Sequence, residues 1–249
     1  MITLKSPREI EAMTRAGHIV AGVLDLMRRS VAPGISTGRL DDLAEEFIVS
    51  HKGAKPSFKG LYGFPRTLCI SINEEIVHGI PSTRRMLREG NIVSVDVGVL
   101  FNDLHADSAT TIPVGEISPQ AQRLLDVTQR CLAAGIEQAR VGNHVGDIGH
   151  AVQQVAETAG FGVVRELVGH GIGTQFHEEP QVPNHGTPKR GPRLLEGMTI
   201  AIEPMITAGH YATRTLGDKW TVVTADGSLS AHFEHTVHIT AAGPTILTR

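Results

Sequence analysis

The chain has 249 residues, 41% of them hydrophobic, and a formal net charge of −3 at pH 7, which suits one large domain or two fused halves with a substantial core. No stretch approaches the roughly 20 apolar residues of a membrane helix, and the N-terminal residues lack the apolar core of a signal peptide, so we expect a cytoplasmic protein. Without a block of like charges, nothing indicates nucleic-acid binding.

The first part of the chain carries two helix signals followed by strand signals. The segment Ser6-Pro7-Arg8-Glu9 has the composition of a capping box with proline at the first helical position. After Pro33-Gly34, apolar residues recur with helical spacing from 40 to 48, which predicts a second amphipathic helix. Strands are predicted at 67–72, 92–100 and about 109–114.

The same order of elements returns after Pro113. Ser118-Pro119 begins a helix, a second helical pattern follows at 146–160, and then comes another apolar strand. We therefore predict a single α+β domain, 1–249, of two pseudo-symmetric halves, about 1–112 and 113–249, whose curved antiparallel sheets are covered by helices. Four prolines and two glycines predict a loop at 180–193.

Two equivalent apolar strands each end in an acid. Residues 89–96 align without a gap on residues 196–203, so that Asp96 and Glu203 occupy matching places. A His-Gly-Ile triplet precedes each copy, beginning at His78 and at His170. An unpaired carboxylate is seldom buried, so two matched acids indicate a shared cation. The alternative for either acid alone is an exposed position on an edge strand.

The spacing of the acids predicts a metal centre. Eleven positions separate Asp96 from Asp107, enough for a strand to turn at Asn102-Asp103 and return with the two acids facing each other. One imidazole and four carboxylates are more than a single ion needs, and they predict two divalent cations held by Asp96, Asp107, His170, Glu203 and Glu234.

The ligand types narrow the choice of metal and of reaction. Oxygen-rich ligation with one histidine and no thiolate favours manganese, iron, cobalt or zinc in a catalytic pair over a structural zinc site. Two such ions about 3.5 to 4 Å apart can activate a shared water and polarise a carbonyl. The predicted reaction class is hydrolysis.

Several candidates also have a structural interpretation. His170 could occupy a tight turn between glycines, although glycines also allow a metal or substrate to approach closely. His177 could be an exposed loop residue, and Glu234 a solvent-facing strand residue. His78 is equally ambiguous, but its equivalence to His170 favours a functional role.

Aromatic and thiol side chains are first interpreted as core. Trp220 and Phe176 are expected in the core, with pocket lining as the alternative. Cys69 and Cys131 are too few for a disulfide framework or a cysteine zinc site and are expected to be small buried hydrophobic residues.

These motifs resemble those of the type I methionine aminopeptidases, a family with a duplicated "pita-bread" fold, over essentially the whole chain. The resemblance rests on the interval between Asp96 and Asp107 and on the segments 77–81, 169–173, 176–180, 202–205 and 233–236. It implies a dinuclear metalloaminopeptidase that removes the initiator methionine from nascent polypeptides, preferring a small second residue.

The resemblance also implies how the ligands are shared. Asp96 would chelate one ion, and His170 and Glu203 would hold the other. Asp107 and Glu234 would bridge the two ions. The identity of the metal stays open because availability and intrinsic affinity both decide it.

The remaining roles are likewise implied by the resemblance. His177 would contact the substrate carbonyl, His78 would lie near the scissile amide nitrogen, and Glu203 would accept the proton of the attacking water. A thioether packs well against aromatic rings and a cysteine, as in a methionine pocket lined by Cys69, Phe176 and Trp220.

Three residues depart from the family pattern. Leu61 stands where an aromatic residue is usual, Tyr62 where histidine is usual, and Ala106 where glycine is usual. The metal ligands are intact, so the departures concern the preference of the methionine pocket.

Two other functions are considered. X-Pro aminopeptidases and prolidases resemble this pattern but usually carry a further N-terminal domain. A peptide-binding homologue without catalysis would not be expected to keep a complete set of buried acids. We expect a monomer without an N-terminal zinc-finger extension or membrane contact, and contact with the ribosome stays open.

Overall fold

The computed structural model describes residues 2–249. Within them the four α-helices are α1 (Pro7–Ser30), α2 (Thr37–Ser50), α3 (Pro119–Gln138) and α4 (Val145–Thr158), and a 3₁₀ turn, η1, spans Leu61–Gly63. The predicted capping box of α1 is confirmed, because the Ser6 hydroxyl accepts from the Glu9 N–H while the Glu9 carboxylate accepts from the Ser6 N–H. α3 also begins with a serine cap followed by proline, since the Ser118 hydroxyl accepts from the Ala121 N–H, but it has no reciprocal capping box.

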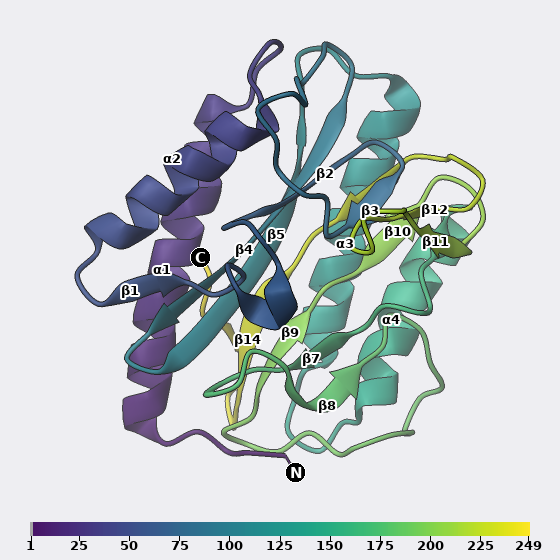
Figure 1. Ribbon diagram of the computed structural model, residues 1–249. Helices are drawn as coiled ribbons and strands as arrows, with labels where there is room; N and C mark the ends of the chain where they lie inside the picture. The colour runs from purple at the N-terminus through teal and green to yellow at the C-terminus, as the bar shows by residue number, and fades with distance from the viewer. Residues whose placement is uncertain (1) are drawn as a thin grey trace.

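The described residues also form fifteen strands, five between α2 and α3 and ten after α4 (Figure 1). They are β1 (Ala54–Pro56), β2 (Cys69–Ile72), β3 (Glu75–Val77), β4 (Ile92–Phe101), β5 (Leu104–Pro113), β6 (Gly162–Val163), β7 (Gly169–Gly171), β8 (Glu178–Val182), β9 (Thr199–Ile202), β10 (Met205–Thr207), β11 (Thr213–Thr215), β12 (Val222–Thr224), β13 (Ser230–His232), β14 (His235–Thr240) and β15 (Gly243–Ile246).

Every described strand pairing is antiparallel. β4 pairs with β5 on one side and with β1 and β2 on the other. A second large sheet has the order β15-β14-β9-β7-β8, and two small sheets have the orders β13-β10-β6 and β11-β12-β3. This arrangement confirms the predicted α+β fold with antiparallel sheets.

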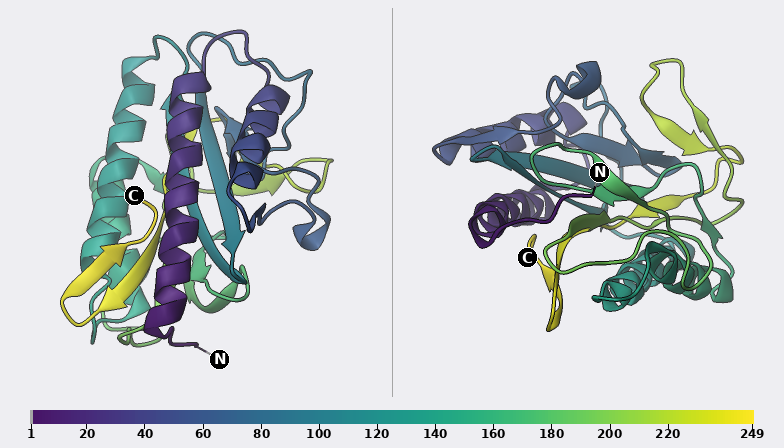
Figure 2. Two further views of the ribbon diagram at one scale, coloured as in Figure 1. Left: turned by 90° about the vertical axis from the view of Figure 1, so that its left-hand side faces the viewer. Right: turned by 90° about the horizontal axis from the view of Figure 1, so that it is seen from below.

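Helices α1 and α3 pack against the strands in two separate cores. Figure 2 shows α1 and α3 running side by side along the strands, with the β14–β15 hairpin between them. Val20 of α1 packs in one core with Val95 of β4, and Leu124 of α3 packs in the other with Ile200 of β9. The predicted boundary between the two halves, near residues 112 and 113, falls at the end of β5, and the division into halves stays a prediction.

Two predicted boundaries are wrong. β5 begins at Leu104 rather than near residue 109, because it pairs with β4 along its whole length although alanine and aspartate disfavour strands. The predicted loop at 180–193 begins later, because residues up to Val182 belong to β8. Proline is tolerated in β8 because this strand lies at the edge of its sheet.

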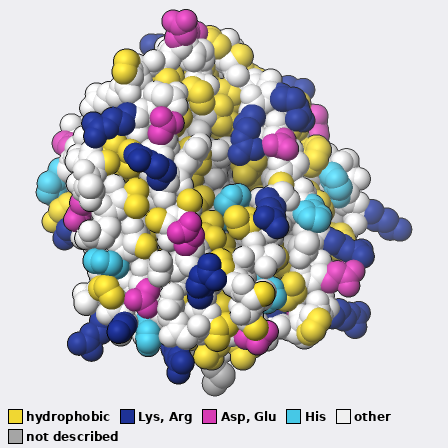
Figure 3. Space-filling model, turned by 180° about the vertical axis from the view of Figure 1, so that it is seen from behind, with side chains coloured by type: hydrophobic (Ala, Val, Ile, Leu, Met, Phe, Trp, Pro, Cys, Tyr) yellow, Lys and Arg dark blue, Asp and Glu magenta, His cyan; other side chains and the backbone are white. Residues whose placement is uncertain are grey.

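No described helix is long and apolar enough to cross a membrane. On the face shown in Figure 3, acidic and basic side chains are interspersed.

Candidate metal centre and pocket

The β4–β5 hairpin brings the first two acids together as predicted. Asn102 and Asp103 form its two-residue turn with φ of 49° and 60°, and Gly98 pairs with Asp107. Residues 96 and 98 share a face of β4, so the side chain of Asp96 lies diagonally across from that of Asp107. Because β4 is paired on both sides, the edge-strand alternative for Asp96 is wrong.

Hydrogen bonds between the two large sheets fix Asp107 and Glu234. The Thr236 hydroxyl accepts from the Asp107 N–H at 2.9 Å and donates to the Asp107 carbonyl at 2.8 Å. The Glu234 N–H donates to the Ala109 carbonyl at 3.0 Å. Glu234 is only 1% exposed, so its interpretation as a solvent-facing strand residue is wrong.

His170 lies in strand β7 rather than in a tight turn. A side chain at Gly169 would overlap the Ala201 carbonyl, and one at Gly171 would overlap the Glu179 carbonyl. The two glycines therefore serve the close approach of the neighbouring strands.

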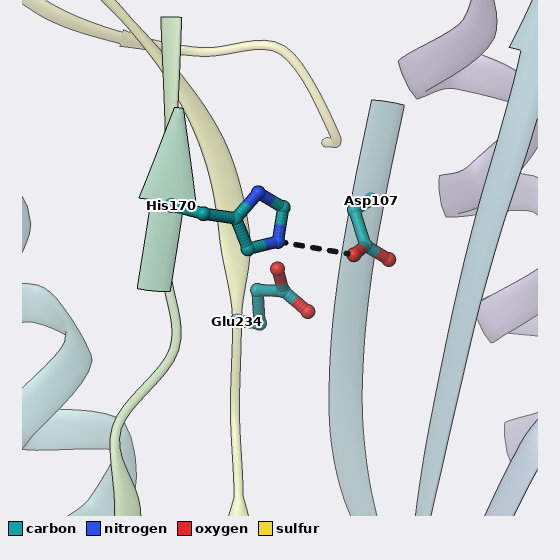
Figure 4. A group of neighbouring side chains, drawn as sticks. All are labelled: Asp107, His170 and Glu234. Atoms are coloured by element: carbon teal, nitrogen blue, oxygen red, sulfur yellow. Dashed lines mark ion pairs between the residues drawn. The ribbon is translucent and has the colours of Figure 1, made fainter. Parts of the chain in front are cut away.

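The ring of His170 presents a free nitrogen to the acids (Figure 4). Its Nδ1 lies 2.8 Å from the Gly171 carbonyl, which can only accept, so Nδ1 carries the proton. Nε2 faces the acids, 4.0 Å from Asp107 Oδ2 and 3.7 Å from Glu203 Oε1. This is the tautomer that a histidine needs as a metal ligand.

The buried acids lack protein partners for several of their oxygens. Ligand atoms of Asp107, His170 and Glu234 all lie within 4.8 Å of one another. Asp96 Oδ1, Asp107 Oδ1 and Glu234 Oε1 are buried without a hydrogen-bond partner among the described residues. Since such oxygens are costly unless they coordinate a cation, the donor set fits divalent metal ions.

Desolvation perturbs the whole cluster when no cation balances it. Burial raises the pKa of Asp96 to about 7 and that of Glu203 to about 8. Burial, together with the neighbouring acids, also raises the pKa values of Asp107 and Glu234 well above the ordinary range. Burial lowers the pKa of His170 to about 4, so its ring is neutral and able to ligate at neutral pH.

His78 lies beside the cluster in a strained conformation. Its φ of 61° is in the left-handed region that a non-glycine residue seldom occupies. Burial, and to a smaller extent the neighbouring His232 and His177, lowers the pKa of His78 to about 4. The ring is therefore neutral at physiological pH. Strain of this kind concentrates at functional sites.

A cavity of about 110 Å³ opens above the acids. All predicted site residues except Glu234 line it, together with Phe58, Leu61, Tyr62 and Phe64. The Phe58 and Phe176 rings meet edge to face at 5.2 Å, and those of Phe64 and Trp220 at 5.1 Å. Trp220 therefore lines the pocket, which was the alternative to its expected place in the core. Phe176 is buried in the core and also lines the pocket.

The two cysteines are buried, as expected. Cys131 is fully buried away from the cavity, and Cys69 lines it from β2, paired with Asp96 of β4. Burial raises the pKa of the Cys69 thiol well above its ordinary value, so the group is a neutral, apolar part of the wall.

His232 belongs to this region but was not predicted. It is 1% exposed, and its Nε2 lies 3.6 Å from Glu203 Oε2. Burial lowers the pKa of His232, which keeps the ring neutral. One local signal was available, because residues two apart in an extended chain share a face and Glu234 follows two positions later.

Comparison with known proteins identifies the family. The model of metallopeptidase family M24 matches residues 11–241. A methionine aminopeptidase of Clostridium perfringens is 53% identical, over 100% of this chain and 99% of the relative. Methionine aminopeptidase 1 of Bacillus subtilis is 51% identical over the full length of both. The chain belongs to the methionine aminopeptidases of metallopeptidase family M24.

Solved structures agree with this membership. A methionine aminopeptidase from Thermotoga maritima has a TM-score of 0.98 and 44% identity, with each chain fully covered. A prolidase from Pyrococcus furiosus has a TM-score of 0.80 at 21% identity, which shows only the shared fold. The predicted family, fold and class of metal-dependent aminopeptidase are confirmed, and the non-catalytic alternative is not supported.

Proposed function

We propose that this M24 methionine aminopeptidase removes the N-terminal methionine from newly made polypeptides whose second residue is small, using two divalent metal ions. The observation that carries the proposal is a cluster of one histidine and four acids, two of them buried, beside a small aromatic pocket. These ligands can bind cations, and the pocket beside them can hold one apolar side chain of a substrate.

The ligands divide between the two ions. Asp96 would hold one ion, His170 with Glu203 would hold the other, and Asp107 and Glu234 would supply ligands to both. The unpartnered oxygens of Asp96, Asp107 and Glu234 support cation binding by these three acids. When bound, the ions supply Lewis acidity to water and to the scissile carbonyl.

The protein groups carry the proton transfers and position the peptide. Glu203 accepts the proton of the attacking water, as its position at the edge of the cavity allows. His177 donates a hydrogen bond to the carbonyl oxygen as negative charge develops on it. His78, neutral because burial lowers its pKa, lies beside the amide nitrogen that becomes the leaving amine.

The aromatic pocket selects the side chain of the first residue. Phe176, Trp220 and Cys69 of β2 line the cavity and provide soft and apolar walls for a thioether. Gly98 makes room for one of these walls, since a side chain there would come within 2.7 Å of the Phe176 ring.

The cellular setting is part of the proposal. A substrate that is a new polypeptide places the enzyme in the cytoplasm, where it acts as a monomer on chains leaving the ribosome. Size measurement of the purified protein tests whether it is a monomer. A ribosome co-sedimentation assay tests whether it associates with the ribosome.

A peptide panel tests the proposed substrate. Metal-reconstituted enzyme is assayed for free amino acid released from Met-Ala-Ser, Met-Leu-Ser, Leu-Ala-Ser and an Ala-Pro peptide. We expect release from Met-Ala-Ser to exceed that from each of the others. Faster cleavage of the Ala-Pro peptide would overturn the proposal in favour of an X-Pro peptidase.

A further inference from the structure

His232 is held rigidly against the metal centre. It ends β13, where it pairs with Met205 of β10. The hydroxyl of Thr111 on β5 accepts from the His232 N–H and donates to the His232 carbonyl, both at 2.9 Å. These contacts with β10 and with Thr111 therefore fix the backbone position from which the His232 side chain extends.

The ring of His232 has one unused polar atom, and that atom faces Glu203. The side chain is 1% exposed, and Nε2 is buried without a hydrogen-bond partner among residues 2–249. Its nearest acidic atom is Glu203 Oε2, at 3.6 Å. A buried polar atom that lacks a partner is costly and calls for an explanation.

Glu203 lies between two imidazoles. Its Oε1 is 3.7 Å from His170 Nε2, and its Oε2 is 3.6 Å from His232 Nε2. Its backbone is also fixed, because the Asn184 amide donates to the Glu203 carbonyl at 3.0 Å. Without His232, no described group would set the rotation of this carboxylate on the Oε2 side.

We propose that His232 is a positioning residue, which donates Nε2–H to Glu203 Oε2 and thereby turns Oε1 toward the metal and the attacking water. A carboxylate can only accept, so the neutral tautomer with its proton on Nε2 is the one that gains a partner. This inference rests on the proposed role of Glu203 as a metal ligand.

Direct metal ligation by His232 is the competing interpretation. His232 Nε2 lies 3.6 Å from Glu203 Oε2, which is not the oxygen that faces the proposed ligand His170. The geometry therefore favours a donor to Glu203 over a further nitrogen ligand.

Metal affinity of substituted enzymes tests the proposal without relying on turnover. Cobalt(II) binding is measured by calorimetry and by its visible absorption for wild type, His232→Gln and His232→Leu. Glutamine keeps an N–H donor without a basic nitrogen, and leucine keeps volume without a donor. We expect leucine to weaken binding about 10- to 100-fold and glutamine by less than about threefold.

His238 provides the matched control. It lies on β14, is half-buried and pairs with Thr199. His238→Gln is expected to leave cobalt affinity and the absorption spectrum unchanged, which separates a specific effect from the general cost of losing a histidine. Circular dichroism verifies that each variant is folded before its affinity is compared.

The remaining outcomes are decisive. Equal loss of affinity in the glutamine and leucine variants would overturn the donor role and favour ligation by the ring. Unchanged affinity in the leucine variant would overturn any role for His232 at the centre. If the wild type itself bound no divalent metal, the proposed function would fail as well. That result is distinguishable from the two outcomes above, in which the wild type binds cobalt. If leucine fails to fold, the glutamine variant alone decides, since ligand loss weakens it and donor retention does not.

Discussion

Lys5 Nζ lies 2.5 Å from Glu178 Oε2, and the two side chains are only 5% and 7% exposed. Glu178 also accepts from the Gln175 N–H at 3.1 Å and from the Thr3 hydroxyl at 2.5 Å. The pair thus ties the N-terminal segment to the loop that carries His177. Although burial raises the pKa of Glu178, hydrogen bonds from Lys5 and Thr3 outweigh it and lower the pKa overall.

Removing the cation of this pair is expected to destabilise the fold and the site together. Lys5→Met leaves the carboxylate of Glu178 buried without its partner, which costs about 3–5 kcal/mol of unfolding free energy. The freed loop misplaces His177, so kcat/KM falls by up to about 100-fold. Denaturant unfolding and peptide hydrolysis measure the two effects.

An exposed ion pair serves as the control for Lys5. Arg15 and Glu11 form a pair at 2.8 Å whose side chains are more than half exposed. Arg15→Met is expected to change stability by less than about 1 kcal/mol, because exposed pairs contribute little. Adding Glu178→Gln to Lys5→Met should recover part of the loss, and no recovery would contradict the assignment to an unpaired charge.

Sequence alone could predict those parts of the site whose signals lie close together along the chain. Asp96 and Asp107 follow from a two-residue turn between strands, and the helix starts follow from their caps. The Lys5–Glu178 pair joins residues 173 positions apart, and no local pattern announces it. His232 was missed for a related reason, since its significance comes from Glu203, which follows β9 and is distant along the chain.

The metal-free protein is expected to lose stability as pH rises. In the folded state burial raises the pKa of Asp96 to about 7 and of Glu203 to about 8, above the values of about 4 in the unfolded chain. The protonated forms therefore favour folding below pH 4, and this contribution is lost as pH rises toward 8. Scanning calorimetry of chelated protein from pH 5.5 to 8.5 should show a falling Tm.

Divalent metal should reverse that trend. Metal binding requires deprotonated ligands, so affinity and the stabilisation by saturating metal both increase with pH. The same calorimetry with saturating manganese or cobalt checks this. A Tm of the chelated protein that is independent of pH would contradict the assignment of the four acids to one desolvated cluster.

Trp220 is expected to contribute to selection of the first residue. Trp220→Ala removes one wall of the pocket and its contact with Phe64, so kcat/KM for methionyl peptides should fall about 10- to 200-fold. The value of kcat/KM should fall less in Trp220→Phe, because an aromatic wall remains. Steady-state kinetics on Met-Ala-Ser distinguish the variants, and equal values for both would count against a packing role.

Tyr62 is expected to support His177 from the mouth of the cavity. Its ring stacks on that of His177 at 5.8 Å although the residue is 74% exposed, and its hydroxyl lies 3.4 Å from Nδ1. Such a contact is worth about 0.5–1.5 kcal/mol, so Tyr62→Ala should lower kcat/KM about 2- to 10-fold. Tyr62→Phe, which keeps the stack, should stay close to wild type, and a loss as large as that of alanine would assign the effect to the hydroxyl instead.

The central claim is that bound divalent ions, held by the five predicted ligands, remove N-terminal methionine. Methionine release from Met-Ala-Ser, before chelation, after full chelation and after metal is added back, tests it most directly in wild type and Asp107→Asn. We expect release by the wild type to disappear on chelation and return with metal, and release by Asp107→Asn to stay at least about 100-fold lower throughout. Release that survives full chelation would contradict the claim.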